Sequence, residues 1–419
     1  MELNLNKLVV GLSRALDFIE IDFLGVVSNH SKRVAYIALQ TAIVHGMGHK
    51  ELFDLATLAI LHDNGMGKAF QLARDSKAPS QVGPEEHTMN KYDKGPGHCV
   101  AGEENVKGFP FLTVPKEVLR YHHENYDGSG FFHVKGEQIP CMAQLIRLAD
   151  MVELHADLRN IDFAGKHELG VFLAKQDGTT LSPEIVADFW AAASYPAFWL
   201  DLKDEFVELA LSRLVPRFST NIRWQDLRKV TRIFSRIIDS KSRFTLLHSQ
   251  ELAERTGRMG AFYGLDDEHI AELQIAADLH DIGKLAVCND ILEKPGKLGP
   301  EEIDVIQRHT YYTRISLQSV TGFENITEWA ANHHEKLDGS GYPYKKKAAD
   351  LDFNARLLAC LDVYQALTEE RPYRGALSHA KAMEILGELV VQGKIDSGIV
   401  QDIDQVFGVS NPSNNAKHS

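Results

Sequence analysis

Residues Glu268–Leu285 read EHIAELQIAADLHDIGKL, and their spacing predicts an amphipathic helix whose inward face ends in polar residues. Apolar side chains recur at steps of three and four from Ile270 to Ala277, which is the period of one helix face. The same steps lead on to His280 and Asp281. Polar groups on a buried face are costly unless a partner compensates them. The stretch therefore predicts a helical fold built around a polar centre.

Other segments of the chain have the same helical period. The segment ITEWAANHH leads from Ile326 to the paired His333 and His334, and ARLLACLDVYQAL places Asp362 among leucines. Alternation of the kind that strands show is scarce throughout. We predict an all-α fold with only minor irregular or short hairpin segments, in which several helices each direct one or two polar side chains to a common point.

These polar residues form a repeat. The second half contains His248, His280, Asp281, His309, His333, His334 and Asp362, and the first half contains His30, His62, Asp63, His98, His122, His123 and Asp150. From the first histidine to the His-Asp pair is 32 residues in both halves, and from the middle histidine to the paired histidines is 24 in both. We predict two tandem helical-bundle domains, residues 1–215 and 216–410, and a disordered tail at 411–419.

Composition narrows the class of protein. At 419 residues the chain is long enough for two or three domains, and its formal charge of -13 argues against a surface for nucleic-acid polymers or anionic membranes. No long apolar run and no signal peptide are evident, which predicts a cytoplasmic protein. The cysteines lack the C-x-x-C spacing, so neither disulfides nor a thiolate zinc site is predicted; they are Cys99, Cys141, Cys288 and Cys360.

The donors of the second half exceed what one metal ion takes. A single buried histidine is usually just packed, but five histidines and two aspartates on inward faces need a shared counter-charge. Two six-coordinate ions fit this set, with Asp281 bridging them. Iron, manganese, nickel and zinc are all compatible with imidazole and carboxylate ligands. Paired ions suit phosphate ester hydrolysis, and Lys284, one turn after Asp281, can reach the phosphate.

The motifs H-D-x-G-K at His280–Lys284 and H-H-E-x-x-D-G-S-G-Y-P at His333–Pro343 resemble those of HD-GYP phosphodiesterases, which hydrolyse cyclic dinucleotides. The resemblance covers roughly residues 223 to 410. It implies an HD-type helical bundle with two divalent ions, iron or manganese favoured, and the seven donors of the second half as ligands. It also implies catalytic roles for Asp281 and Lys284, and substrate contacts from Lys284, Tyr342, Arg371 and Arg374. Phe244 replaces a glutamate that holds a third ion in some members, so we expect two ions.

The first half resembles the same domain with altered residues. Met66 takes the place of Lys284 while Lys68 lies two residues further on, Gly130-Phe131-Phe132 replaces Gly-Tyr-Pro, and Arg159 is retained but Asp162 stands where Arg374 does. We therefore predict that this half supports or regulates the other across a shared interface and does not catalyse, although its ligand set permits metal. The tandem resembles the 3'3'-cyclic GMP-AMP phosphodiesterases of Vibrio.

Three functions are compatible with these residues. The first is hydrolysis of a cyclic dinucleotide, 3'3'-cyclic GMP-AMP or cyclic di-GMP, to a linear product. The second is an HD nucleotidohydrolase acting on free nucleotides, which needs only a simpler H, HD, D set. The third is a binding module without activity, which fits the first half better than the second. The sequence leaves the preferred dinucleotide, further cleavage of the product and the oligomeric state open.

Overall fold

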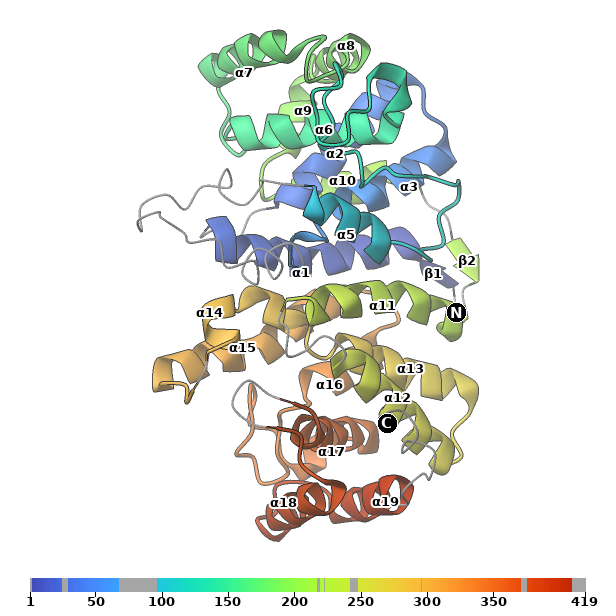
Figure 1. Cartoon of the computed structure of the whole chain (residues 1–419), viewed down its shortest axis with the longest axis vertical. Helices are drawn as coiled ribbons and strands as arrows, with labels where there is room; N and C mark the ends of the chain where they lie inside the picture. Colours follow the sequence, from blue (N-terminus) through green and yellow to red (C-terminus); the bar gives the residue numbers. More distant parts are fainter. Residues whose placement is uncertain are drawn as a thin grey trace, which may run out of the picture. The chain divides into compact units, whose positions relative to one another are not determined.

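A computed structural model describes residues 2–24, 29–67, 96–216, 219–221, 223–241, 248–294, 296–370 and 375–408. The chain divides into two compact units, Glu2–Asn221 and Ile222–Ser419, which we call the N-terminal and the C-terminal unit (Figure 1).

Helices make up most of the N-terminal unit. Its elements are β1 (Glu2–Asn4), α1 (Leu5–Leu24), α2 (His30–His45), α3 (His49–Ile60), α5 (Gly97–Asn105), the short helix η2 (Gly136–Gln138), α6 (Cys141–His155), α7 (Phe163–Gln176), α8 (Pro183–Ala192), α9 (Pro196–Asp201), α10 (Val207–Leu214) and β2 (Ser219–Asn221). The strands β1 and β2 pair antiparallel, with Glu2 opposite Asn221.

Helices are the regular elements of the C-terminal unit among its described residues. Its elements are α11 (Trp224–Asp239), α12 (His248–Phe262), α13 (Asp267–Leu279), the short helix η3 (Ile282–Ala286), α14 (Asn289–Leu292), α15 (Pro300–Leu317), α16 (Glu324–Ala331), the short helix η4 (Ala348–Asp350), α17 (Phe353–Thr368), α18 (His379–Val391) and α19 (Ser397–Phe407). The expected all-α fold is confirmed, with one short strand pair as its minor segment.

One helix forms the centre of each unit. In the N-terminal unit α2 packs against α3, α6 and α8, and its Val34 and Ile37 are fully buried. In the C-terminal unit α12 packs in the same way against α13, α17 and α19. Equivalent polar contacts recur in the two units: His45 Nδ1 on α2 lies 2.7 Å from Asp188 Oδ2 on α8, and the hydroxyl of Tyr263, directly after α12, donates to Asp402 Oδ2 on α19 over 2.8 Å. The two units thus repeat one arrangement of helices.

The segment from α9 to β2 is packed on the N-terminal unit. Phe198 and Trp199 are buried, and α10 lies against α2 and α1. Within the part of the chain that is described, no helix combines the length and the apolar character needed to span a bilayer.

Candidate metal centres

The C-terminal unit brings the seven predicted donors of that half together from separate elements. His248 is the first residue of α12, His309 lies in α15, and Asp362 lies in α17. The other donors follow the ends of two helices: His280 and Asp281 come directly after α13, and His333 and His334 come in the turn after α16. Each of these elements directs one or two polar side chains inward, where all but His334 are buried. The donors meet near the middle of the helical bundle.

Asp281 lies between two groups of histidines. Its Oδ2 is 3.1 Å from His280 Nε2 and 3.8 Å from His248 Nε2. The other oxygen, Oδ1, is 3.4 Å from His309 Nε2 and 3.8 Å from His333 Nε2. Donors that share an ion at bonds of about 2.1 Å are separated by roughly 3 to 3.5 Å. Each oxygen of this carboxylate therefore faces a separate pair of histidines, and each pair would help to hold one divalent ion.

Asp362 completes the first of these groups. Its Oδ1 lies 3.4 Å from His248 Nε2 and 3.8 Å from His280 Nε2, while Oδ2 lies 3.8 Å from His334 Nδ1. The ligand atoms of His309, His333 and His334 all lie within 4.8 Å of one another. Two neighbouring groups of donors result, with carboxylates shared between them.

Backbone hydrogen bonds fix which ring nitrogen faces the centre. The Nδ1 atoms of His280, His309 and His333 lie 2.6 to 2.8 Å from the carbonyl oxygens three residues earlier in the chain. A carbonyl can only accept, so each Nδ1 carries the proton and each Nε2 presents a lone pair. Burial lowers the pKa of His309 to about 4 and that of His333 to about 3, which keeps both rings neutral at physiological pH.

The centre has the electrostatics of a cation site. Burial raises the pKa of Asp281 and Asp362, but neighbouring histidines outweigh it and hold both well below the ordinary value. Asp281 Oδ1 and His280 Nε2 are buried and make no hydrogen bond. Buried polar atoms in proteins rarely lack a hydrogen-bond partner unless a water molecule or an ion binds them. The donor set fits divalent metal ions, which would bind both atoms.

A carboxylate that the motifs did not mark orients His248. Glu369, directly after α17, has its two oxygens 2.9 and 3.0 Å from His248 Nδ1. Burial lowers the pKa of His248, but hydrogen bonds with Asp362 and Glu369 raise it to about 9. Carboxylates in this position fix the ring of a metal-binding histidine and strengthen it as a ligand. The motifs do not include Glu369, although it follows Asp362 by seven residues, which is two helical turns along the same face.

Gly283 allows η3 to approach α15. A Cβ atom built on Gly283 would lie 1.9 Å from the carbonyl oxygen of His309 and 2.7 Å from the nitrogen of Thr313. Only glycine fits such a close approach of two backbones. The glycine of the H-D-x-G-K motif therefore sets the distance between Asp281 and His309.

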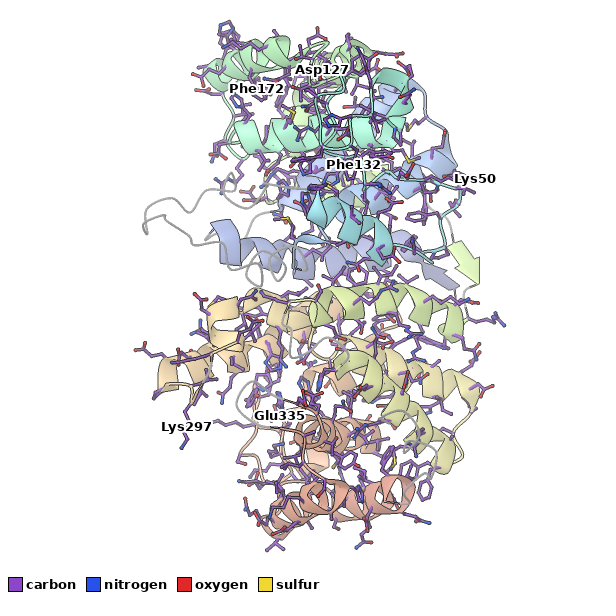
Figure 2. The ribbon with its side chains drawn as sticks, viewed as in Figure 1. Lys50, Asp127, Phe132, Phe172, Lys297 and Glu335 are labelled. Atoms are coloured by element: carbon purple, nitrogen blue, oxygen red, sulfur yellow. The ribbon has the colours of Figure 1, made fainter. Side chains whose placement is uncertain are left out.

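The glutamate of the H-H-E motif holds the loop that follows it. Glu335 is buried, and its carboxylate accepts hydrogen bonds from the backbone of Tyr344 over 2.7 Å and of Lys346 over 3.0 Å. Figure 2 labels Glu335 in the interior of the C-terminal unit. The loop brings the ring of Tyr342 to a centroid distance of 5.0 Å from His334. The Gly-Tyr-Pro turn thus covers one side of the histidine pair.

Of the predicted substrate contacts, Lys284 and Tyr342 lie at the centre. Lys284 Nζ donates to Asp281 Oδ2 over 2.6 Å, and its side chain is one-fifth exposed. Arg371 and Arg374 lie outside the described residues, as do Lys68 and Phe244.

The N-terminal unit repeats much of this geometry. His30, His62 and Asp150 have ligand atoms within 4.8 Å of one another. Like Asp281, Asp63 lies between two groups of histidines. Asp63 Oδ2 is 3.3 Å from His62 Nε2, while Oδ1 is 3.8 Å from His122 Nε2. An orienting carboxylate also recurs in this unit, as Glu153 on α6 pairs with His30 Nδ1 over 2.5 Å. All seven predicted donors of this half lie near one point; the remaining ones are His98 and His123.

Two of the altered residues of the N-terminal unit, Asp162 and Phe132, and the retained Arg159 make local contacts. Asp162 caps α7 by accepting from the Gly165 nitrogen over 2.8 Å, and Arg159 pairs with Asp157 over 2.8 Å. The guanidinium carbon of Arg120 lies over the ring of Phe132, which is labelled in Figure 2, at 5.0 Å from the centroid of that ring. Phe131 is 42% exposed, and Met66 is half-buried.

Comparison with known proteins defines the class. The model of the HD domain family matches residues 22–161 and 232–399, and the chain belongs to this family. The family expected from the motifs is thereby confirmed. Over 97% of its length the chain is 30% identical to the 3'3'-cGAMP-specific phosphodiesterase 1 of Vibrio cholerae, covering 94% of that protein.

Two further matches differ in the share of the chain that they cover. A cyclic di-GMP phosphodiesterase of Thermotoga maritima is 32% identical over 35% of this chain and 40% of its own. The crystal structure of a cyclic GMP-AMP specific phosphodiesterase from Vibrio cholerae aligns with a TM-score of 0.66 at 23% identity, covering 98% of this chain and 99% of that one. At this identity the structural match supports the fold alone.

Proposed function

We propose that this chain is a metal-dependent cyclic dinucleotide phosphodiesterase that hydrolyses 3'3'-cyclic GMP-AMP to a linear dinucleotide in its C-terminal unit. The relative that matches almost the whole chain is specific for this substrate, whereas the cyclic di-GMP phosphodiesterase of Thermotoga maritima matches about a third of it. Cyclic di-GMP is therefore the second candidate substrate.

The position of Asp281 carries the proposal. One carboxylate faces two sets of imidazole nitrogens, and its Oδ1 is buried without a hydrogen bond. Two divalent ions, with iron or manganese preferred over nickel or zinc, would satisfy these atoms. When bound, such a pair supplies a hydroxide nucleophile and offsets the charge of the phosphate.

The chain's own residues bind and orient the substrate. Lys284 is partly exposed beside Asp281 and would donate to the reacting phosphate or the leaving oxygen. Tyr342 packs on His334 and keeps that ring in place; burial raises the pKa of its phenol, so it stays neutral. Arg371 and Arg374 are assigned to the dinucleotide phosphates, because guanidinium groups suit this task.

The N-terminal unit is assigned a supporting role without turnover. Met66 cannot donate to a phosphate, and Asp162 already serves as a helix cap. A free-nucleotide hydrolase is disfavoured, because such an enzyme has no use for the additional His309, His333 and His334.

The test is turnover by the purified full-length protein of 3'3'-cyclic GMP-AMP and cyclic di-GMP, with the linear products separated by chromatography. Asp281→Ala should abolish hydrolysis of both. Asp304→Ala removes an exposed carboxylate that pairs with Arg308 on α15 and is the matched control, which should keep full activity. Faster turnover of cyclic di-GMP would reverse the substrate assignment, and normal turnover by Asp281→Ala would refute the site.

A further inference from the structure

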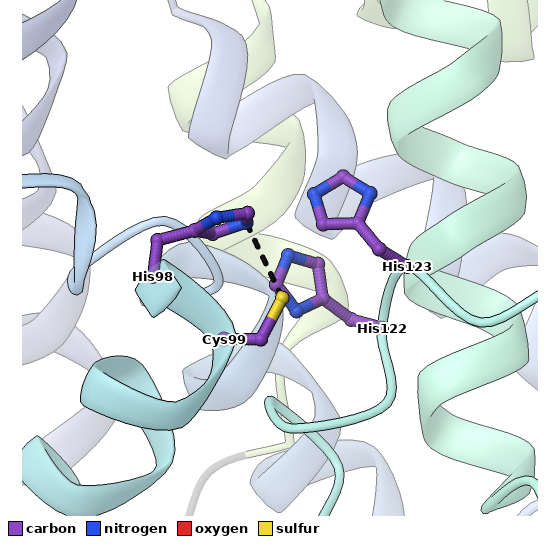
Figure 3. A group of neighbouring side chains, drawn as sticks. All are labelled: His98, Cys99, His122 and His123. Atoms are coloured by element: carbon purple, nitrogen blue, oxygen red, sulfur yellow. Dashed lines mark hydrogen bonds between the residues drawn. The ribbon is translucent and has the colours of Figure 1, made fainter. Parts of the chain in front are cut away.

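The N-terminal centre contains a thiol that the C-terminal centre lacks. The ligand atoms of His98, Cys99, His122 and His123 all lie within 4.8 Å of one another. Figure 3 shows these side chains converging from α5 and from the loop that carries the paired histidines. Cys99 is fully buried, and its Sγ lies 3.4 Å from His98 Nε2. The residue after the corresponding histidine of the C-terminal unit is Thr310.

Arg147 removes one histidine from this set of donors. Its Nη1 lies 2.8 Å from His123 Nδ1, and arginine can only donate. Nδ1 therefore accepts from Arg147 and is not available to a metal ion, whereas the corresponding His334 Nδ1 of the C-terminal centre faces Asp362 over 3.8 Å. Three residues before the aspartate of the C-terminal centre stands Ala359, so this contact has no counterpart there. The N-terminal centre has lost the donor that His334 supplies in the other.

His122 points an unsatisfied nitrogen into the same space. Its Nδ1 lies 2.6 Å from the Leu119 carbonyl oxygen, so Nε2 presents a lone pair. This Nε2 is buried and has no hydrogen-bond partner, and the residue is fully buried. Asp63 Oδ1 lies 3.8 Å from His122 Nε2 and 4.0 Å from His98 Nε2. Two imidazoles, a thiol and a carboxylate thus surround one point.

We propose that the N-terminal unit holds a thiophilic divalent ion of the zinc class through His98, Cys99 and His122, with Asp63 as the fourth donor. In this site the thiolate replaces the histidine that Arg147 occupies. Tetrahedral zinc with bonds of about 2.3 Å to sulfur and about 2.0 Å to nitrogen separates those donors by roughly 3.5 Å. The 3.4 Å between Cys99 Sγ and His98 Nε2 fits this separation.

The two centres differ in the class of ion they prefer. Thiolate favours zinc and other soft ions, whereas imidazole and carboxylate alone also suit iron and manganese. Binding releases the thiol proton, and a four-coordinate site closed by protein donors stabilises the fold. The site in the N-terminal unit is therefore structural, and the proposal holds whether or not the C-terminal unit hydrolyses a cyclic dinucleotide.

Cobalt(II) is the probe, because its bond to a thiolate gives a near-ultraviolet charge-transfer band that imidazole and carboxylate ligands do not give. The metal-free full-length protein is titrated with cobalt(II) as wild type, as Cys99→Ser and as Cys141→Ser. Cys141 lies on α6 in the same unit and outside the cluster, so it controls for loss of a thiol. We expect the band in the wild type and in Cys141→Ser, and its loss in Cys99→Ser. A band that survives in Cys99→Ser would overturn the proposal.

A second measurement needs no variant. X-ray absorption at the zinc edge of the zinc-loaded wild-type protein should show a sulfur scatterer at about 2.3 Å in addition to nitrogen and oxygen. Zinc bound with nitrogen and oxygen neighbours alone would contradict the thiolate site, even if Cys99→Ser failed to fold. Either result leaves the assay of dinucleotide hydrolysis unaffected, so the two proposals fail separately.

Discussion

Replacing Gly283 by alanine should destabilise the C-terminal unit and impair its metal centre together. The added Cβ would meet the His309 carbonyl oxygen at 1.9 Å, about 1.5 Å short of ordinary contact, and the obstacle is backbone that cannot rotate away. Overpacking of this kind costs about 1 to 3 kcal/mol, and a rigid obstacle places the cost near the upper value. For a unit of this size about 3 kcal/mol corresponds to a melting temperature lower by roughly 6 to 12 °C.

The metal should be lost for the same reason. Asp281 Oδ1 and His309 Nε2 are 3.4 Å apart, and relieving the overlap would move their elements apart by about an ångström or more. Metal–ligand distances tolerate only about 0.2 Å. Metal content is measured on the purified variant, and thermal unfolding is followed by circular dichroism with chelator present, which separates the two effects.

Gly387→Ala is the matched control. This glycine lies within α18, and a Cβ there meets no atom within 4 Å. The variant should be unchanged or more stable by up to about 1 kcal/mol, because alanine favours the helix. A Gly283→Ala protein that melts with the wild type and retains its metal would refute the close approach of η3 and α15.

Three further outcomes are expected. Lys284→Met, which introduces the residue of the N-terminal unit, should retain metal but lower kcat on the order of 10²-fold, and a fall in metal content would mark the lysine as structural. Burial lowers the pKa of His248, but two carboxylates, one from Glu369, raise it to about 9. The charged ring thus stabilises the metal-free protein below about pH 6.5, and this stability should fall as the pH rises through 9; Glu369→Gln should flatten the dependence in unfolding measurements. Arg371→Ala and Arg374→Ala should raise KM with metal content unchanged, and unaltered kinetics in both would remove them from the substrate site.

The sequence by itself determined the helical class and the repeat of donors. Helix periodicity is a local property, so it shows which face of each segment turns inward, and this was sufficient to place Asp281 and Asp362 on buried faces. Matched spacings then indicated that both halves carry the same set of polar residues. Neither inference, from helix periodicity or from matched spacings, requires knowledge of how the chain folds between the segments.

Only the tertiary structure decided which groups from different elements meet. The orienting carboxylate follows Asp362 by seven residues as Glu369 but follows Asp150 by three as Glu153, so no fixed spacing marks it. Cys99 and Arg147 lie 48 positions apart, and the spacing of the cysteines does not indicate a thiolate site. Their placement depends on how α5 and α6 pack around the paired histidines, and packing is set by the shapes of many side chains at once.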